Sequence, residues 1–99
     1  MSSALPEVKA LRIDPRDNVA VALEEIAAGS RVLIQGTTLE ALDRIPFAHK
    51  VALQPIAPGE PILKYGVPIA FATARIRPGD WVHEHNAQSY FAAKRKVEL

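Results

Sequence analysis

Short apolar segments separated by turn residues run along the whole chain. Residues 8–13 partly alternate apolar and polar side chains, which predicts a strand with one solvated face. Residues 19–23 form a short apolar run and predict a buried strand. A helix is the alternative there, because Ala, Leu and Glu favour one, but the segment is short and Gly29 closes it. Further strands are predicted at residues 31–35, 49–53, 61–65, 67–74 and 81–85.

The remaining segments lack a clear strand pattern. Residues 37–43 fit either a strand or an irregular arm, and residues 1–7 are expected to be loose. Asn86 is a favoured helix N-cap, and the basic residues at 94–96 suit a helix C-terminus, so residues 87–99 are predicted to be a helix or a tail. Eight prolines and five glycines among short strands favour a compact all-β single domain over residues 8–86.

A seven-residue pattern, Ile-x-x-Gly-x-x-[Val/Ile], occurs three times, at residues 26–32, 56–62 and 76–82. Pro58 and Pro78 fix φ ahead of the glycine, and glycine takes positive φ at no steric cost, so each copy predicts a type II turn. The flanking aliphatic residues are expected to enter the core. The spacings of 30 and 20 residues are unequal, which excludes a solenoid and indicates one small element reused inside one domain.

Composition narrows the class of protein. Ninety-nine residues make one domain, and a net charge of +1 gives no case for nucleic-acid binding. There is no cysteine, so neither a disulfide framework nor a thiolate metal site is expected. No apolar stretch approaches the ~20 residues that span a bilayer, and no secretory signal is visible, so no membrane role and a cytoplasmic location are expected. A chain of this size has little room to enclose a substrate, so if it takes part in catalysis it is expected to complete a site held by a partner.

The candidate chemistry gathers at residues 77–86, which hold two of the three histidines and the single tryptophan. On a strand, His83 and His85 would share a face, with α-carbons roughly 6.6 Å apart. One metal ion could then be reached by both rings, with Asn86 or a distant carboxylate adding oxygen. The alternative is two exposed histidines on an edge strand. Trp81 is expected in the core or at an interface.

Several segments taken together resemble a known family. They are residues 17–23, 49–53, 56–69, 72–73 and 81–86. This ordered set is similar to the SAF domain of the altronate/galactarate dehydratase family over about residues 8–86. The resemblance implies an all-β β-clip fold, found either at the N-terminus of a long sugar-acid dehydratase or as a separate small subunit; the (2R)-sulfolactate sulfo-lyase small subunit is a relative. The chain departs from the family pattern at Ala48 and Ala70, where glycine is usual.

The resemblance also implies a function. It indicates the small subunit of a metal-dependent hydro-lyase that dehydrates altronate or galactarate together with a large catalytic subunit. The implied cofactor is a divalent metal, Fe²⁺ or Mn²⁺, bound by the chain or only by the complex. The implied site residues are His49, His83 and His85 as catalytic groups, the latter two also as metal ligands, with Lys50 and Asn86 binding substrate. A stand-alone small-molecule binding module, a sulfolactate sulfo-lyase small subunit and a homo-oligomer remain open.

Overall fold

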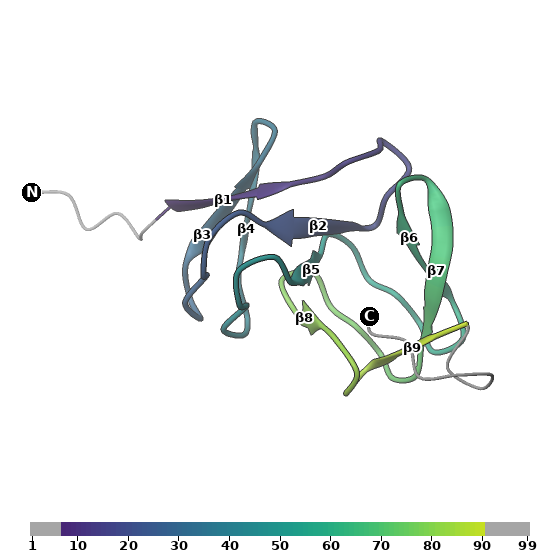
Figure 1. Ribbon diagram of the computed structural model, residues 1–99. Helices are drawn as coiled ribbons and strands as arrows, with labels where there is room; N and C mark the ends of the chain where they lie inside the picture. The colour runs from purple at the N-terminus through teal and green to yellow at the C-terminus, as the bar shows by residue number, and fades with distance from the viewer. Residues whose placement is uncertain (1–6, 91–99) are drawn as a thin grey trace, which may run out of the picture.

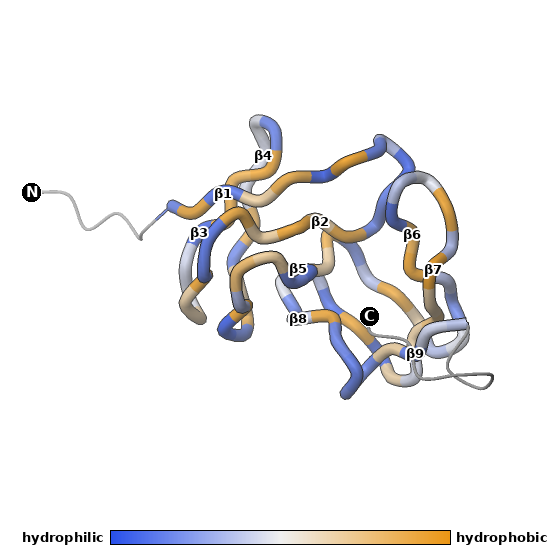
Figure 2. The backbone as a smooth tube through the Cα atoms, viewed as in Figure 1, coloured by the Kyte–Doolittle hydropathy of each residue, from blue (hydrophilic) through white to orange (hydrophobic). Residues whose placement is uncertain are grey.

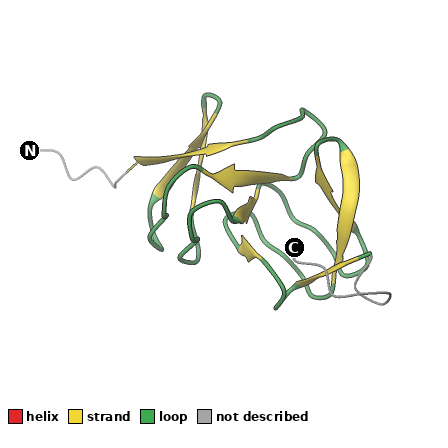
Figure 3. Ribbon diagram, in the orientation of Figure 1, coloured by secondary structure: helices red, strands yellow, loops and turns green. Residues whose placement is uncertain are grey.

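The computed structural model describes residues 7–90, which form two β-sheets and contain no helix (Figures 1 and 3). The strands are β1 (Glu7–Leu11), β2 (Val19–Ala22), β3 (Arg31–Ile34), β4 (Thr37–Glu40), β5 (Lys50–Ala52), β6 (Pro61–Lys64), β7 (Val67–Ala72), β8 (Trp81–Val82) and β9 (Ala87–Ser89). The six-stranded sheet has the order β4-β3-β1-β2-β5-β8, and the other sheet has the order β6-β7-β9. Among the strands of residues 7–90, only β1 and β3 pair in parallel. The predicted all-β fold is confirmed.

Strands β2, β5 and β8 form a wall with a hydrophobic core on each side. Successive side chains of a strand point to opposite faces. In this wall Ala20 and Val51 enter one core, while Val19 and Ala52 enter the other. A strand buried on both faces has a continuous apolar sequence rather than an alternating one. This explains the apolar run of β2, which Figure 2 shows in the warm colours of hydrophobic residues, and it confirms a strand there instead of a helix.

The three predicted turns are present. Each glycine has a φ between 88° and 93°. The residue after it donates its N–H to the carbonyl of the residue two positions before it, at 2.9–3.1 Å. The isoleucine that opens each copy and the aliphatic residue that closes it are fully or almost fully buried. The prediction that each turn anchors two core residues is therefore confirmed.

The structure adds a fourth copy of this turn, at residues 45–51, where Ala48 takes the place of glycine with a φ of 70°. The four copies associate in two pairs. Ile26 and Ile45 exchange backbone N–H···O bonds of 2.8–2.9 Å, and Ile56 and Ile76 do the same at 2.9 Å. The copies belong to a longer duplication, since residues 21–36 and 51–66 are identical at eight of sixteen positions.

Gly79 is the glycine that packing constrains most tightly. A β-carbon at this position would collide with the backbone carbonyl of Glu40. The carbonyl of Gly79 also accepts the N–H of Leu42 at 2.9 Å. The turn before β8 therefore lies directly against the chain that follows β4, and only glycine combines positive φ with this close approach.

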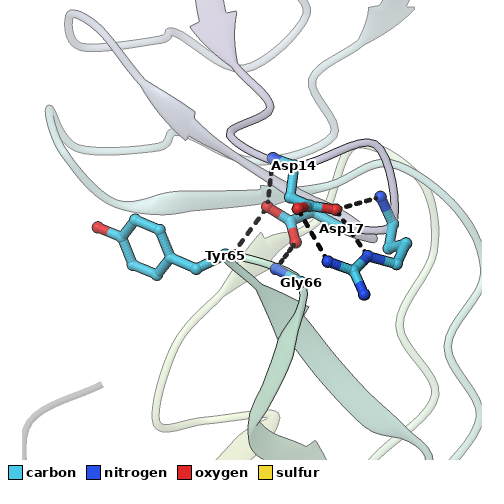
Figure 4. Close-up of polar contacts among 5 residues, drawn as sticks. Asp14, Asp17, Tyr65 and Gly66 are labelled. Atoms are coloured by element: carbon cyan, nitrogen blue, oxygen red, sulfur yellow. Dashed lines mark hydrogen bonds and ion pairs between the residues drawn. The ribbon is translucent and has the colours of Figure 1, made fainter.

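A polar link joins the β1–β2 loop to the β6–β7 hairpin (Figure 4). The carboxylate of Asp17 accepts the backbone N–H groups of Tyr65 and Gly66 at 3.1 and 2.7 Å, and that of Asp14 at 3.0 Å. Next to it, the Asn18 side chain bonds the backbone of Pro61 and Leu63. Both side chains are buried, and their hydrogen bonds compensate the cost of burying them. The segment at residues 14–18, between β1 and β2, thus also ties the two sheets together.

Strands extend beyond the predicted residues 8–86 at both ends. β1 already begins at Glu7, which was expected to be loose. At the other end, Ala87–Ser89 is not the start of a helix capped by Asn86 but strand β9, which pairs with β7. The sequence preference for a helix is overridden here because β9 completes the second sheet and buries Ala87 in its core. Residues 1–6 and 91–99, on which the rest of those predictions fall, lie outside the described part of the chain.

Within residues 7–90 the structure has no helix long and apolar enough to span a bilayer.

Ala48 gives a direct test of the repeated turn. A residue with a β-carbon at positive φ is strained by about 1–2 kcal/mol. Glycine has no such strain there, and the extra chain entropy that it loses on folding costs less than this strain. We expect A48G to raise the free energy of unfolding by about 0.5–1 kcal/mol, measured by urea denaturation. The matched control is G59A, because an added β-carbon there meets nothing within 4 Å; it should lower stability by a similar amount. A destabilised A48G variant would contradict the positive-φ assignment.

Candidate functional site

The candidate site is built where β5 pairs with β8. In this pair Lys50 lies opposite Val82 and Val51 opposite Trp81. Continuing the register places His49 opposite His83, at the ends of the two strands. The indole N–H of Trp81 donates a hydrogen bond to Nδ1 of His49, with Nε1 and Nδ1 3.1 Å apart.

All three histidines of the chain contact its single tryptophan. The ring of His83 stacks on the indole of Trp81 with centroids 5.2 Å apart and planes 7° apart. The ring of His85 lies 5.0 Å from the indole at 39°, and His49 lies 5.7 Å from it at 41°. The rings of His49 and His83 are 4.8 Å apart. We refer to these four residues as the His–Trp cluster.

The cluster arises in a different way from the one predicted. The strand does not run to His85 but ends at Val82, and residues 83–86 form a turn; it is the hydrophilic corner between β8 and β9 in Figure 2. The side chain of Asn86 holds this turn, accepting the N–H of His83 at 3.0 Å and donating to the carbonyl of Trp81 at 2.8 Å. Such local side-chain bonds compete with the strand ladder. His83 and His85 share a side because both contact one ring.

Asn86 was also predicted to bind substrate. Its side chain is buried, and both its oxygen and its nitrogen bond the backbone. The structure therefore gives it a clear structural role, and substrate binding stays a prediction.

Lys50 is separated from the His–Trp cluster by the wall itself. It shares a face of β5 with Ala52, which belongs to the core on the side of the second sheet, whereas Trp81 packs on the other core. Its side chain is only 4% exposed. The structure thus brings His49, His83 and His85 together and places Lys50 apart from them, and its contact with a substrate carboxylate stays a prediction.

The environment of His49 favours its neutral form. Burial, and after it the charges of His83, Lys50 and Arg44, lower the pKa of His49 from its ordinary value of 6.5. A neutral imidazole near pH 7 has one nitrogen that donates and one that accepts. The cluster can therefore take part in proton transfer or hydrogen bonding to a ligand.

The described residues do not make a metal site by themselves. Iron is commonly held by two histidines and one carboxylate. Within residues 7–90 no three His, Cys, Asp or Glu side chains converge on a common point suited to a metal. His83 and His85 can therefore supply at most two ligands, and their assignment as ligands stays a prediction.

Two features of the site escaped the sequence reasoning. Trp81 packs against a core, as expected, but it is also the centre of the site. In the sequence this second role is indicated only by its place two residues before His83. Asp43 accepts the backbone N–H of Trp81 at 3.1 Å and so holds the start of β8; no sequence pattern indicates this contact. A cavity of about 170 Å³ lies elsewhere, lined by Arg12, Ile34, Gln35, Thr37, Leu39 and Leu53.

Comparisons of the sequence with known proteins find one family and several relatives. Residues 8–90 match the altronate/galactarate dehydratase SAF domain. Over 79 residues the sequence is 39% identical to an altronate dehydratase of Bacillus subtilis and 40% identical to one of Escherichia coli, covering 80% of this chain but only 16% of either enzyme. Over 75 residues it is 37% identical to the (2R)-sulfolactate sulfo-lyase subunit alpha of Chromohalobacter salexigens, covering 70% of this chain and 80% of that subunit.

The pH dependence of stability tests whether Lys50 is buried at the wall of β2, β5 and β8. Burial, and then the charge of Lys64, lower its pKa from 10.5 to about 8. A folded-state pKa below the unfolded one means that the charged amine destabilises the fold below pH 8, and that this cost disappears as pH rises toward about 10.5. We expect the free energy of unfolding of the wild type to rise between about pH 8 and pH 10.5 in urea denaturation, and that of K50M to lack this rise.

The control for this prediction is K9M, which removes an exposed lysine of β1. It should leave the pH dependence of stability unchanged. If the wild type and K50M show the same pH dependence, Lys50 is not a buried cation in solution.

Proposed function

Because the chain belongs to the altronate/galactarate dehydratase SAF-domain family, we propose that it is the small subunit of a hydro-lyase that dehydrates a sugar acid such as altronate or galactarate. In this proposal a separate large subunit holds most of the active site, and the His–Trp cluster completes it. The observation that carries the proposal is the gathering of all three imidazoles around Trp81 in a chain of this family.

The coverage of the relatives supports a role as a subunit. The chain spans 16% of the altronate dehydratases that it matches, so the remaining length of those enzymes has no counterpart in the matched region. The relative that it covers to 80% is itself described as a subunit. A domain of this size that works with a much larger partner is consistent with both observations.

The cluster suits the chemistry of a dehydration. Loss of water from a sugar acid removes the proton next to the carboxylate and expels the neighbouring hydroxyl group. The reaction needs a base for the proton, an acid for the leaving hydroxide and charge stabilisation for the intermediate. Imidazoles serve as acid or base near neutral pH. His83 is part-buried and His85 is exposed, so we propose that both reach a substrate bound between this chain and its partner.

The large subunit would supply what the described residues lack. The predicted divalent metal, Fe²⁺ or Mn²⁺, needs further ligands beyond His83 and His85, so we propose that it is bound only in the complex. The carboxylate groups of the substrate also need cationic partners, and Lys50 points to the other side of the wall. The cytoplasmic location expected from the sequence stays a prediction.

Sulfolactate is the second candidate substrate. The similarity to the sulfo-lyase subunit alpha, with 80% of that protein covered, favours it. Elimination of sulfite would make the same demands as elimination of water, namely a base at the carbon next to the carboxylate and a donor near the leaving group. The imidazoles suit both reactions, so the choice between them depends on the partner.

Activity should require both proteins. We expect the purified chain alone to turn over no sugar acid, and the chain co-purified with the large subunit from its own organism to dehydrate one of a set of aldonates and aldarates, or to release sulfite from sulfolactate. In that complex H83A or H85A should lower kcat by about 100-fold or more, the contribution typical of acid–base catalysis.

The control is Q88A in β9, an exposed residue outside the cluster, which should retain full activity. If the complex turns over neither substrate class, the proposed function is wrong. If the chain alone binds a sugar acid and H83A/H85A leaves binding intact, it is a stand-alone binding module instead.

Metal binding should also require both proteins. In equilibrium dialysis with Mn²⁺, we expect the chain alone to bind no stoichiometric metal, because only two of its imidazoles are candidate ligands, while the complex binds about one ion. H83A/H85A should weaken binding by the complex about 10-fold or more. One tightly bound Mn²⁺ on the chain alone would contradict the assignment of the missing ligands to the partner.

A further inference from the structure

The hydrogen bond between Trp81 and His49 is specific for one nitrogen of the imidazole. The indole N–H can only donate, and it donates to Nδ1 of His49 at 3.1 Å. A neutral imidazole carries a single proton, on either Nδ1 or Nε2, and the nitrogen that accepts a bond is the one without it. This contact therefore stabilises the tautomer of His49 that carries its proton on Nε2.

We propose that Trp81 is a positioning residue that locks His49 in the Nε2–H tautomer and thereby makes His49 a hydrogen-bond donor to a ligand oxygen, rather than a base or a metal ligand. The identity of the oxygen rests on the proposed function, where it belongs to a carboxylate or hydroxyl group of the sugar acid. The tautomer itself rests only on the contact within this chain.

The indole is held firmly enough to select one tautomer. The backbone N–H of Trp81 donates to Asp43 at 3.1 Å, and its carbonyl accepts the side-chain N–H of Asn86 at 2.8 Å. Its side chain packs on the core, and the ring of His83 stacks on it almost in parallel. With backbone and ring fixed, the direction of the indole N–H is fixed as well. His49 must turn its unprotonated nitrogen toward it.

The fixed tautomer of His49 gives the three imidazoles different roles. In His49 the Nδ1 lone pair is occupied and the Nε2 position carries the proton, so neither nitrogen is available to take up a proton or bind a cation while the Trp81 contact persists. His83 and His85 contact the same indole through their rings, and within residues 7–90 no hydrogen bond occupies their ring nitrogens. They are the imidazoles left to bind a cation or to act as base. His49 supplies the donor that a leaving oxygen or a carboxylate requires.

Nitrogen NMR of the full chain, labelled with ¹⁵N, tests the tautomer directly. At a pH where all three histidines are neutral, we expect His49 to show an unprotonated Nδ1 and a protonated Nε2. We also expect a scalar coupling between the indole Nε1 of Trp81 and Nδ1 of His49 across the hydrogen bond. A protonated Nδ1 on His49 in the wild-type protein would overturn the proposal, and this measurement needs no variant to fold.

The variant W81F keeps an aromatic ring and removes the N–H. We expect the Nδ1 signal of His49 to move toward the protonated range, because the two tautomers then exchange. His85 is an internal control, since it contacts the same ring without a hydrogen bond and should keep its tautomer balance. An unchanged His49 spectrum in folded W81F would overturn the role of Trp81.

Activity of the complex tests whether His49 acts as a hydrogen-bond donor through Nε2. The amide nitrogen of H49Q can donate near the position of Nε2, whereas the amide of H49N lies near Nδ1 and leaves no donor at the outer position. We expect H49Q to retain at least 10-fold more kcat than H49N; equal losses would overturn the donor role. The NMR result is independent of turnover, so an inactive complex whose His49 has the expected tautomer would refute the proposed function and leave the tautomer lock intact.

Discussion

Strands β2, β5 and β8 separate two hydrophobic cores, and most of their apolar side chains enter one core or the other. The alternation of a strand enforces this division, since neighbours such as Val51 and Ala52 point to opposite faces. Burial of both faces explains how a chain of 99 residues builds two sheets with strands of two to six residues. A shift of register by one residue would exchange the two cores, so the wall specifies its own pairing.

The same alternation decides which polar residues can act together. His49 and Lys50 are adjacent in sequence, yet one lies with Trp81 on one side of the wall and the other lies with Ala52 on the opposite side. Burial disfavours the charge of Lys50, whereas the His–Trp cluster lies at the end of the β5–β8 pair, where its rings keep partial exposure. The three histidines therefore lie with Trp81 on one side of the wall, and Lys50 lies on the other.

Much of the architecture follows from local patterns. The repeated Ile-x-x-Gly-x-x-[Val/Ile] segments predict their turns because glycine alone takes positive φ freely, and the structure adds a fourth turn in which Ala48 takes that conformation. The pattern does not detect this fourth copy, because alanine stands where the pattern requires glycine. Pairing of the copies, Ile26 with Ile45 and Ile56 with Ile76, cannot be derived from the pattern, because backbone bonds between distant segments carry no sequence signature.

The sequence by itself determined an all-β chain of short strands, the three glycine turns and the histidines as candidate site residues, because these depend on side-chain type and on spacing along the chain. Only the tertiary structure decided that β8 ends at Val82, that Ala87–Ser89 joins a sheet instead of starting a helix, and that His49 meets Trp81. The reason is that these outcomes depend on which distant strand completes a sheet or a core, and the free energy of that completion exceeds local preferences for helix or strand.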